Sequence, residues 1–342
     1  MVKKIRGTRP LVTVVVSTRR RSRYLRDLLD SLKAQKFRDF EVVVVEDSEE
    51  LDSKLKVLRL VKRYSEELKV RLVLNPGNVG LPTSLNKGVL EARGEIIAFT
   101  DDDCIADEMW LSRLLKWYED PLVGGVGGKV VPIERDAIWS KKVVKGRPVV
   151  GRVNWDGEVV GNFDLGKEPS YVDCLPGANM SFRRELVLKA GGFSPIYKGN
   201  AYRFETDLCL KVKRLGYKIV YDPKAVIFHR RAGKGGARTN VYMWNYWFAR
   251  NHILLLLKNL DDSVIRALIF LAKQVLRILL KRRTCPYAEP KRWHLVLFMI
   301  LKGFFDGVRA YLRSSALGVK PRRLGLAVSE GGLEVVALEV NR

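Results

Sequence analysis

Three consecutive aspartates, Asp101, Asp102 and Asp103, follow a short apolar run in the segment GEIIAFTDDDC. The run, residues 96–100, is β-branched and aromatic, which is typical of a buried strand. Adjacent carboxylates repel one another, so a cation is needed to offset their charge at the edge of a core. Mn²⁺ or Mg²⁺ holding the phosphates of a substrate would do so, because hard oxygen ligands suit these ions. The alternative is a solvated acidic turn that also caps a helix starting near Asp107.

Two further polar side chains lie at the ends of predicted strands. Ser17 ends the apolar run 11–17, and Asp47 follows the run 40–45. In open α/β sheets, ligands bind outside the carboxyl ends of the parallel strands. One ligand could therefore contact Ser17, Asp47 and the three aspartates.

A second acidic pair, Glu205 and Asp207, stands at the start of a predicted helix in FETDLCLKVKRLGYKIVYDP. The helix dipole favours acidic residues in a first turn, which would account for Asp207 without any function. Glu205 is expected just before the helix, where its side chain can face a cleft.

His229 follows a predicted strand at 220–228 and precedes the segment RRAGKGGAR. A histidine in this position is either an ordinary structural residue or a metal ligand. Glycines interleaved with Arg230, Arg231 and two further cations predict a basic loop suited to closing over a diphosphate.

Asn179 offers a side-chain amide in the segment CLPGANMSF, where Gly177 suits a tight turn beneath a ligand. An ordinary turn residue is the alternative interpretation of Asn179. The segment GGVGG at 124–128 fits neither GxGxxG nor a Walker loop, which points away from dehydrogenases and P-loop NTPases. A nucleotide would then be held by carboxylates and metal.

The elements that must position these residues alternate between strands and helices. Helical spacing of apolar residues predicts helices around 22–32, 51–68 and 82–92, and a third strand covers 70–74. This alternation predicts an α/β fold with a mostly parallel, Rossmann-like central sheet and helices on both faces.

Composition narrows the classes of function. The 342 residues are 47% apolar and carry a formal net charge of +24, which favours an anionic partner: a nucleotide, a phospholipid surface or nucleic acid.

Four cysteines without a CxxC pair argue against a zinc site and a disulfide framework, and indicate a reducing cytoplasm. The basic N-terminus leads into a strand-length run, so no signal peptide is expected, and no apolar run is long enough to span a bilayer. Scarce glutamine hints at a thermophilic source.

Together, several segments resemble the family 2 glycosyltransferases with the GT-A fold. The segments are VTVVVST, VVVVED, NVGLPTSLNKG, EIIAFTDDDC, GANMSFRREL, ETDLCLKVKRLGYKIVYDP and His229, spread over about residues 10–250 in the order and spacing of the family. The resemblance implies an inverting, hexosyltransferase-like transfer of a sugar from a nucleotide-diphosphate sugar to an acceptor hydroxyl.

The resemblance also implies roles for individual residues. Ser17 and Asp47 would contact the nucleoside, Gly80 would lie in the nucleotide-sugar site, and Asp101 and Asp102 would lie by the ribose and diphosphate. Asp103 would bind the metal, with His229 and Asp101 as further ligands, and the acidic motif before LCLKVKRLGY would carry the base. By alignment that base is Glu205, where the family commonly has aspartate, and Asp207 remains its rival. An arginine common in the third helix of the family is replaced by Leu85, so the basic loop after His229 would have to supply that diphosphate contact.

Beyond about residue 240 the family pattern fades into apolar, basic helices around 242–257, 264–280 and 293–312. Such helices either lie in a membrane interface beside anionic head groups or form a bundle packed on the catalytic domain. We therefore expect a catalytic domain over 1–240, a helical extension over 241–320 and a closing β-hairpin over 321–342. A glycan or lipid-linked acceptor at the inner face of the cell membrane would suit this arrangement.

Two other functions compete with glycosyl transfer. A metal-dependent sugar nucleotidyltransferase would release pyrophosphate instead of a nucleoside diphosphate, and would leave Glu205 without a role. A basic membrane-binding or nucleic-acid-binding protein without catalysis would bind anionic vesicles or RNA in a salt-sensitive way. The acidic triplet would weaken such a surface, so no specific nucleic-acid partner is expected.

Overall fold

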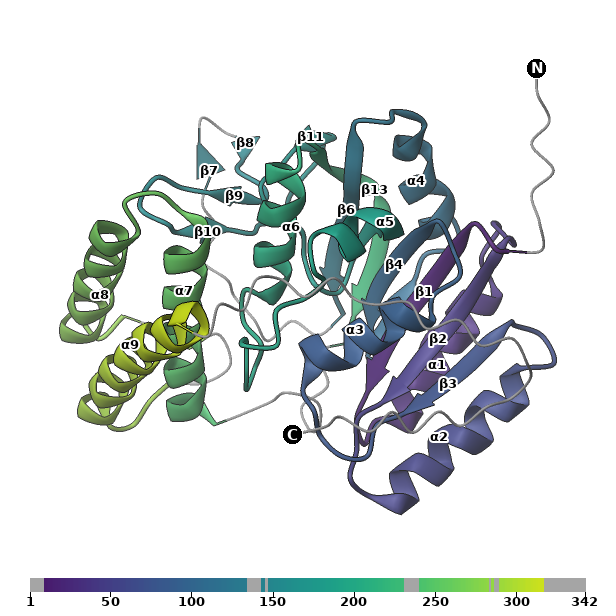
Figure 1. Ribbon diagram of the computed structural model, residues 1–342, viewed down its shortest axis with the longest axis horizontal. Coiled ribbons are helices and arrows are strands. Elements are labelled where there is room, and N and C mark those ends of the chain that lie inside the picture. The colour runs from purple at the N-terminus through teal and green to yellow at the C-terminus, as the bar shows by residue number, and fades with distance from the viewer. Residues whose placement is uncertain are drawn as a thin grey trace.

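The computed structural model describes residues 9–133, 143–144, 147–230, 240–282, 284–285 and 289–316. Within these residues, a nine-stranded mixed sheet forms the centre of the molecule, with helices on both of its faces (Figure 1). Its strand order is β11-β13-β6-β12-β4-β1-β2-β3, and β5 pairs with β13. The predicted α/β fold is therefore confirmed.

The strands of the sheet are β1 (Val12–Thr18), β2 (Phe40–Glu46), β3 (Val70–Leu74), β4 (Ile96–Asp101), β5 (Cys104–Ala106), β6 (Val123–Pro132), β11 (Ser170–Tyr171), β12 (Met180–Arg183) and β13 (Lys218–His229). The helices against it are α1 (Ser22–Lys33), α2 (Leu51–Tyr64), α3 (Leu81–Glu91), α4 (Trp110–Lys116), α5 (Arg184–Lys189) and α6 (Phe204–Arg214). A short 3₁₀ turn, η1, covers Trp117–Glu119. Two small ribbons pair β7 (Val143–Val144) with β8 (Arg147–Pro148), and β9 (Arg152–Val153) with β10 (Val159–Val160).

The strands β1 to β4 are parallel, as are β6 and β13. The exception at the centre is β12, which runs antiparallel to both β4 and β6. The register places Ser17 of β1 between Val45 of β2 and Asp101 of β4. The carboxyl ends of the first strands therefore meet at one edge, as the sequence predicted.

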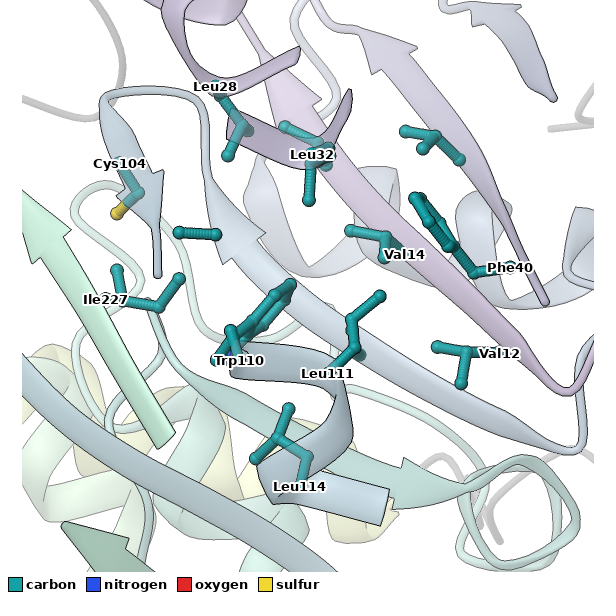
Figure 2. Close-up of a cluster of buried hydrophobic side chains, with 14 of the residues drawn as sticks. Val12, Val14, Leu28, Leu32, Phe40, Cys104, Trp110, Leu111, Leu114 and Ile227 are labelled. Atoms are coloured by element: carbon teal, nitrogen blue, oxygen red, sulfur yellow. The ribbon is translucent and has the colours of Figure 1, made fainter. Parts of the chain in front are cut away.

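Side chains of the central strands alternate between two cores because successive residues of a strand point to opposite faces. Val12, Val14 and Val16 pack beneath α1, α2 and α4, whereas Val15 packs beneath α3 on the other face. Figure 2 shows the first of these cores, with Leu28 and Leu32 of α1 and Trp110 of α4 against the sheet. Because helices cover both faces of the sheet, β1 and β2 carry valines at consecutive positions.

Three helices form the C-terminal extension: α7 (Val241–Asn259), α8 (Ser263–Leu279) and α9 (Trp293–Ala316). They share a core of their own, built from Ala249, Ile253, Leu256, Ala267, Phe270, Ile300 and neighbouring side chains. Gly303 and Gly307 let α9 approach α7 closely, since a Cβ at Gly303 would lie 2.4 Å from the carbonyl oxygen of Tyr246. The predicted helical extension is thus present.

The boundaries at residues 240 and 320 stay predictions, and the predicted hairpin at 321–342 lies outside the described residues. Across the described ranges, no helix combines the length and the hydropathy that crossing a bilayer requires.

Candidate active site

An acidic cluster lies at the carboxyl edge of the sheet, where β4 ends and β5 begins. Asp101 is the last residue of β4, and Cys104 opens β5, which pairs antiparallel with the end of β13. This pairing sets Cys104 opposite His229, although the two are far apart in the sequence. Ligand atoms of Asp101, Asp103, Cys104 and His229 all lie within 4.8 Å of one another.

The donor set of this cluster fits a hard divalent cation. The Nε2 atom of His229 lies 3.0 Å from Oδ1 of Asp103 and 3.9 Å from Oδ2 of Asp101. Burial raises the pKa of the Cys104 thiol well above its ordinary value, and the charges of Asp101 and Asp103 raise it further. A thiol that stays protonated is a poor metal ligand. Two carboxylates and one imidazole remain, a set suited to Mn²⁺ or Mg²⁺.

Asp102, the middle aspartate, turns away from this cluster into the protein. Thr18 donates a hydrogen bond of 2.7 Å to Oδ2 of Asp102. Arg21 donates to Oδ1 of Asp102 at 3.1 Å and to Oδ2 of Asp103 at 3.3 Å. Asp102 therefore anchors Arg21 at the start of α1, and Arg21 in turn orients Asp103. Nothing in the sequence singles out Arg21, because it is one of several neighbouring arginines.

Asp47 shapes the loop before α3. Its carboxylate accepts hydrogen bonds from the side chain of Asn75 at 2.8 Å, and from the backbone of Val79 at 2.9 Å and of Gly80 at 3.1 Å. Gly80 has φ +90°, a conformation that favours glycine. Ser17 lies one strand away, next to Asp101 in the register. These contacts hold the 75–80 loop beside the acidic cluster.

Glu205 lies in the first turn of α6, since the helix begins at Phe204 and not after Glu205 as expected. Burial raises the pKa of Glu205 to about 7. Its own backbone N–H and the charge of Arg203 oppose this rise, and the charge of Asp101 adds to it. The charge of Asp101 in the acidic cluster is therefore among the causes of the raised pKa of Glu205.

Asp207 faces the C-terminal helices. Its Oδ1 atom accepts from Lys258 at 2.9 Å and from Asn259 at 2.7 Å, both at the end of α7, and Lys211 lies 3.0 Å from Oδ2. Burial alone would raise the pKa of Asp207, but Lys211 and Lys258 outweigh it and hold the pKa at about 2. These contacts join α6 to α7 and leave Asp207 poorly suited to accept a proton.

The amide of Asn179 is completely buried within the framework. It accepts from Nε1 of Trp110 at 2.8 Å and donates to the carbonyl oxygens of Lys129 and Ala225, each at 2.9 Å. It thereby ties β12 to β6, β13 and α4, and both of its N–H groups are used. This geometry favours the framework interpretation over a ligand contact.

Arg230 begins the basic segment after β13. Its backbone N–H donates to the carbonyl oxygen of Asp103 at 3.0 Å, and its guanidinium pairs with Asp27 of α1. Arg231 and the rest of the predicted basic loop lie outside the described residues.

Two residues of α7 hold the segment that leads into α6, and the sequence did not single them out. Arg250 donates to the carbonyl oxygen of Ile196, and Asn251 donates to that of Lys198, each at 2.9 Å. The run Arg250-Asn251-His252 interrupts an apolar helix, and three polar residues in such a helix could have indicated a buried contact.

A family model described as Glycosyl transferase family 2 matches residues 13–187. A glucosyl-dolichyl phosphate glucuronosyltransferase of Haloferax volcanii is 28% identical over 64% of this chain and 69% of its own length. The O-antigen biosynthesis protein RfbC of Myxococcus xanthus is 25% identical over 72% of this chain, which spans only 19% of that protein.

Among solved structures, the chain resembles the mannosyltransferase PcManGT from Pyrobaculum calidifontis, solved in complex with GDP-Man and Mn²⁺. The TM-score is 0.52 at 20% identity, over 92% of this chain and 78% of that one. At this identity the likeness establishes the fold, which is the GT-A fold that the sequence predicted.

Proposed function

Because the chain belongs to glycosyl transferase family 2, we propose that it transfers a sugar with inversion from a nucleotide-diphosphate sugar to an acceptor hydroxyl. A divalent cation would bind at Asp101, Asp103 and His229, and Glu205 would act as the base. The observation that carries this proposal is the convergence of Asp101, Asp103 and His229, whose ligand atoms lie within 4.8 Å of one another in a set suited to a divalent cation. Burial raises the pKa of Glu205 to about 7, which suits the base that such a site needs.

The donor would lie along the carboxyl edge of the sheet. The loop that Asp47 holds, together with Ser17, would receive the nucleoside, and the diphosphate would lie over the acidic cluster. Bound there, the ion would supply electrostatic stabilisation of the charge that grows on the departing diphosphate. Arg21, fixed by Asp102, would keep Asp103 in position as a ligand. Arg230 and Arg231 would add positive charge near the same phosphates.

Glu205 would take the proton from the acceptor hydroxyl as that oxygen attacks the anomeric carbon. A pKa of about 7 suits this role, because the carboxylate is both available near neutral pH and basic enough to accept the proton. Attack from the face opposite the departing diphosphate inverts the anomeric configuration. Asp207 is not part of this mechanism, since Lys211 and Lys258 hold its proton affinity low.

We propose that the acceptor is a glycan or a lipid-linked sugar and that the C-terminal helices meet an anionic membrane. The relative from Haloferax volcanii is named for a lipid-linked substrate, glucosyl-dolichyl phosphate. Several large apolar side chains of α8 and α9 are exposed, among them Val264 at 65% and Phe305 at 64%. Helices of this kind, in a chain with a net charge of +24, can lie in the interface of an anionic bilayer. The cytoplasmic face is the side on which nucleotide-sugar donors would meet it.

The test is a screen of nucleotide sugars with purified protein, Mn²⁺ or Mg²⁺, and neutral and lipid-linked acceptors. Release of nucleoside diphosphate that chelation abolishes, together with an inverted product by NMR, supports the proposal. Release of pyrophosphate would indicate nucleotidyl transfer, and a retained configuration would contradict the role of Glu205. Flotation with anionic and neutral vesicles tests the membrane contact separately.

A further inference from the structure

Arg203, two residues before Glu205, is a nearly buried arginine. Only 9% of the residue is exposed, and its Nε atom is buried without a hydrogen-bond partner. Among the residues that the structure describes, Arg203 forms no ion pair with a carboxylate within 4.0 Å. Buried charges in proteins are normally paired, because removing a charge from water without compensation is costly.

The backbone at Arg203 is also held in an unusual conformation. Its φ is +76° and its ψ is 4°, in the left-handed region that costs most residues free energy. The position directly precedes α6 as its N-cap. Such strain persists where surrounding contacts impose it, and it is enriched at functional sites. Arg250 and Asn251 of α7 hold the segment that leads to Arg203.

The guanidinium of Arg203 lies against an aromatic cluster. It stacks over the ring of Tyr202 at 4.1 Å, and that ring lies 5.1 Å from Phe248 and 6.1 Å from Trp244. Tyr202 is partly exposed, so this group reaches the surface. Aromatic faces beside a cation are well suited to a sugar that carries a negative charge.

The positive charge of Arg203 also affects the pKa values of two other residues, Glu205 and His252. It lowers the pKa of Glu205, where burial acts in the opposite direction. Burial lowers the pKa of His252 in α7 well below its ordinary value, and Arg203 lowers it further. The Nδ1 atom of His252 is buried without a partner as well. Two buried nitrogen atoms without a hydrogen-bond partner, Nε of Arg203 and Nδ1 of His252, thus belong to residues that interact electrostatically.

We infer that Arg203 binds an anionic group of the acceptor, a phosphate or a carboxylate, and so positions the attacking hydroxyl at Glu205. This inference rests on the proposed function, and it defines the acceptor subsite as one for a negatively charged sugar. The anion would provide the hydrogen-bond acceptor that the guanidinium lacks. Arginine is the residue best matched to such a group, because its planar fork can donate two parallel hydrogen bonds.

The experiment compares acceptors that differ only in charge: a methyl glycoside, the matching sugar 1-phosphate, the matching uronic acid glycoside and a short-chain polyprenyl-phosphate sugar. Nucleoside diphosphate release is measured for the wild type, Arg203→Gln, Arg203→Lys and the control Arg63→Gln. The control removes the same charge from an exposed position on α2. All three replacements keep a side chain at their positions, and melting temperatures identify any variant that fails to fold.

We expect the wild type to prefer an anionic acceptor over the methyl glycoside by about tenfold to a hundredfold in kcat/KM. Arg203→Gln should lose this preference through a raised acceptor KM, Arg203→Lys should keep part of it, and Arg63→Gln should keep all of it. Preference for the polyprenyl phosphate alone would identify a lipid headgroup, and equal preference for the sugar 1-phosphate would identify a free phosphate.

A wild type without any preference for anionic acceptors, or an Arg203→Gln variant that keeps the preference, would overturn the inference. If Arg203→Gln does not fold, competition by inorganic phosphate against the anionic acceptor in the wild type decides, and absence of competition counts against the site. Failure of the proposed function looks different, since no acceptor would then support nucleoside diphosphate release.

Discussion

The Nε2 atom of His229 lies 3.0 Å from the carboxylate of Asp103, although the two residues are 126 positions apart in the chain. The antiparallel pairing of β5 with the end of β13 creates this contact. It completes a cluster in which two carboxylates and an imidazole converge at the edge of the sheet.

Replacing Asp103 by Asn should remove the dependence on Mn²⁺ together with most of the activity. An amide keeps the size of the side chain but loses the charge that attracts the cation. We expect kcat/KM to fall by at least about a hundredfold, and the melting temperature to stop responding to Mn²⁺ added with a nucleoside diphosphate. Differential scanning fluorimetry measures the second effect. Asp52→Asn on the exposed start of α2 is the control. An unchanged response to Mn²⁺ in Asp103→Asn would place the ion elsewhere.

The rate of transfer should rise with pH through about 7, because Glu205 must lose its proton to act as a base and its pKa is raised to about 7. A profile of kcat against pH, with an acceptor that does not titrate in this range, checks this expectation. A flat profile between about pH 5 and about pH 8 would contradict it.

The same raised pKa makes a prediction for stability. The folded state holds the proton of Glu205 more tightly than the unfolded state, whose pKa is near 4.5. Its contribution to stability is therefore fully present below that value and is lost as the pH rises through about 7. Glu205→Gln should consequently be more stable than the wild type above that range and equal to it below pH 4.5. Denaturant titrations at the two extremes measure the difference, and a Glu205→Gln variant less stable at high pH would show that the carboxylate is stabilised there.

Asp207 should behave as a structural residue. Its pKa is held at about 2 against an ordinary 3.8, so the stability it provides is present above 3.8 and is lost as the pH falls toward 2. Asp207→Asn leaves Lys211 and Lys258 without their buried partner and should cost about 3–5 kcal/mol of unfolding free energy at neutral pH. This loss of unfolding free energy should be smaller at acidic pH, where Asp207 of the wild type is itself protonated. The folded fraction of Asp207→Asn should still catalyse transfer. Loss of transfer in a well-folded Asp207→Asn variant would show that Asp207 takes part in the mechanism.

Asn251 should affect catalysis from a distance. Asn251→Ala removes the hydrogen bond to the carbonyl oxygen of Lys198 and leaves that oxygen without this donor, which should cost about 1–3 kcal/mol. The segment before Glu205 would then be held less firmly, so we expect kcat to fall by about tenfold while the donor KM changes little. A lower melting temperature with unchanged kcat would show that the contact serves stability alone.

The first strands and helices could be predicted from the sequence because each follows a local pattern of residues. The valine runs of β1 and β2 and the helical spacing in α1 are each determined by nearby residues. The acidic triplet could be located, but not the direction of each side chain. That Asp102 points inward depends on Thr18 and Arg21, which reach it from more than 80 positions away in the chain.

The environment of α6 could not be predicted for the same reason. Nothing near Asp207 in the sequence indicates Lys258, and nothing near Asn179 indicates Trp110. Contacts between residues far apart in the sequence determine the pKa of Asp207 and the hydrogen bonds of the Asn179 amide. The segment that leads to Arg203 is likewise held by residues of α7 that lie beyond the family pattern.

The most direct test of the account is the behaviour of Glu205→Gln in the presence of a donor, Mn²⁺ and an acceptor. We predict that its rate of nucleoside diphosphate release falls by about a hundredfold to ten-thousandfold, while stabilisation by nucleoside diphosphate with Mn²⁺ stays at the wild-type level. Loss of transfer with intact donor binding would assign the proton transfer to Glu205. Turnover within about threefold of the wild type would contradict the account, because the hydroxyl would then be activated without this carboxylate.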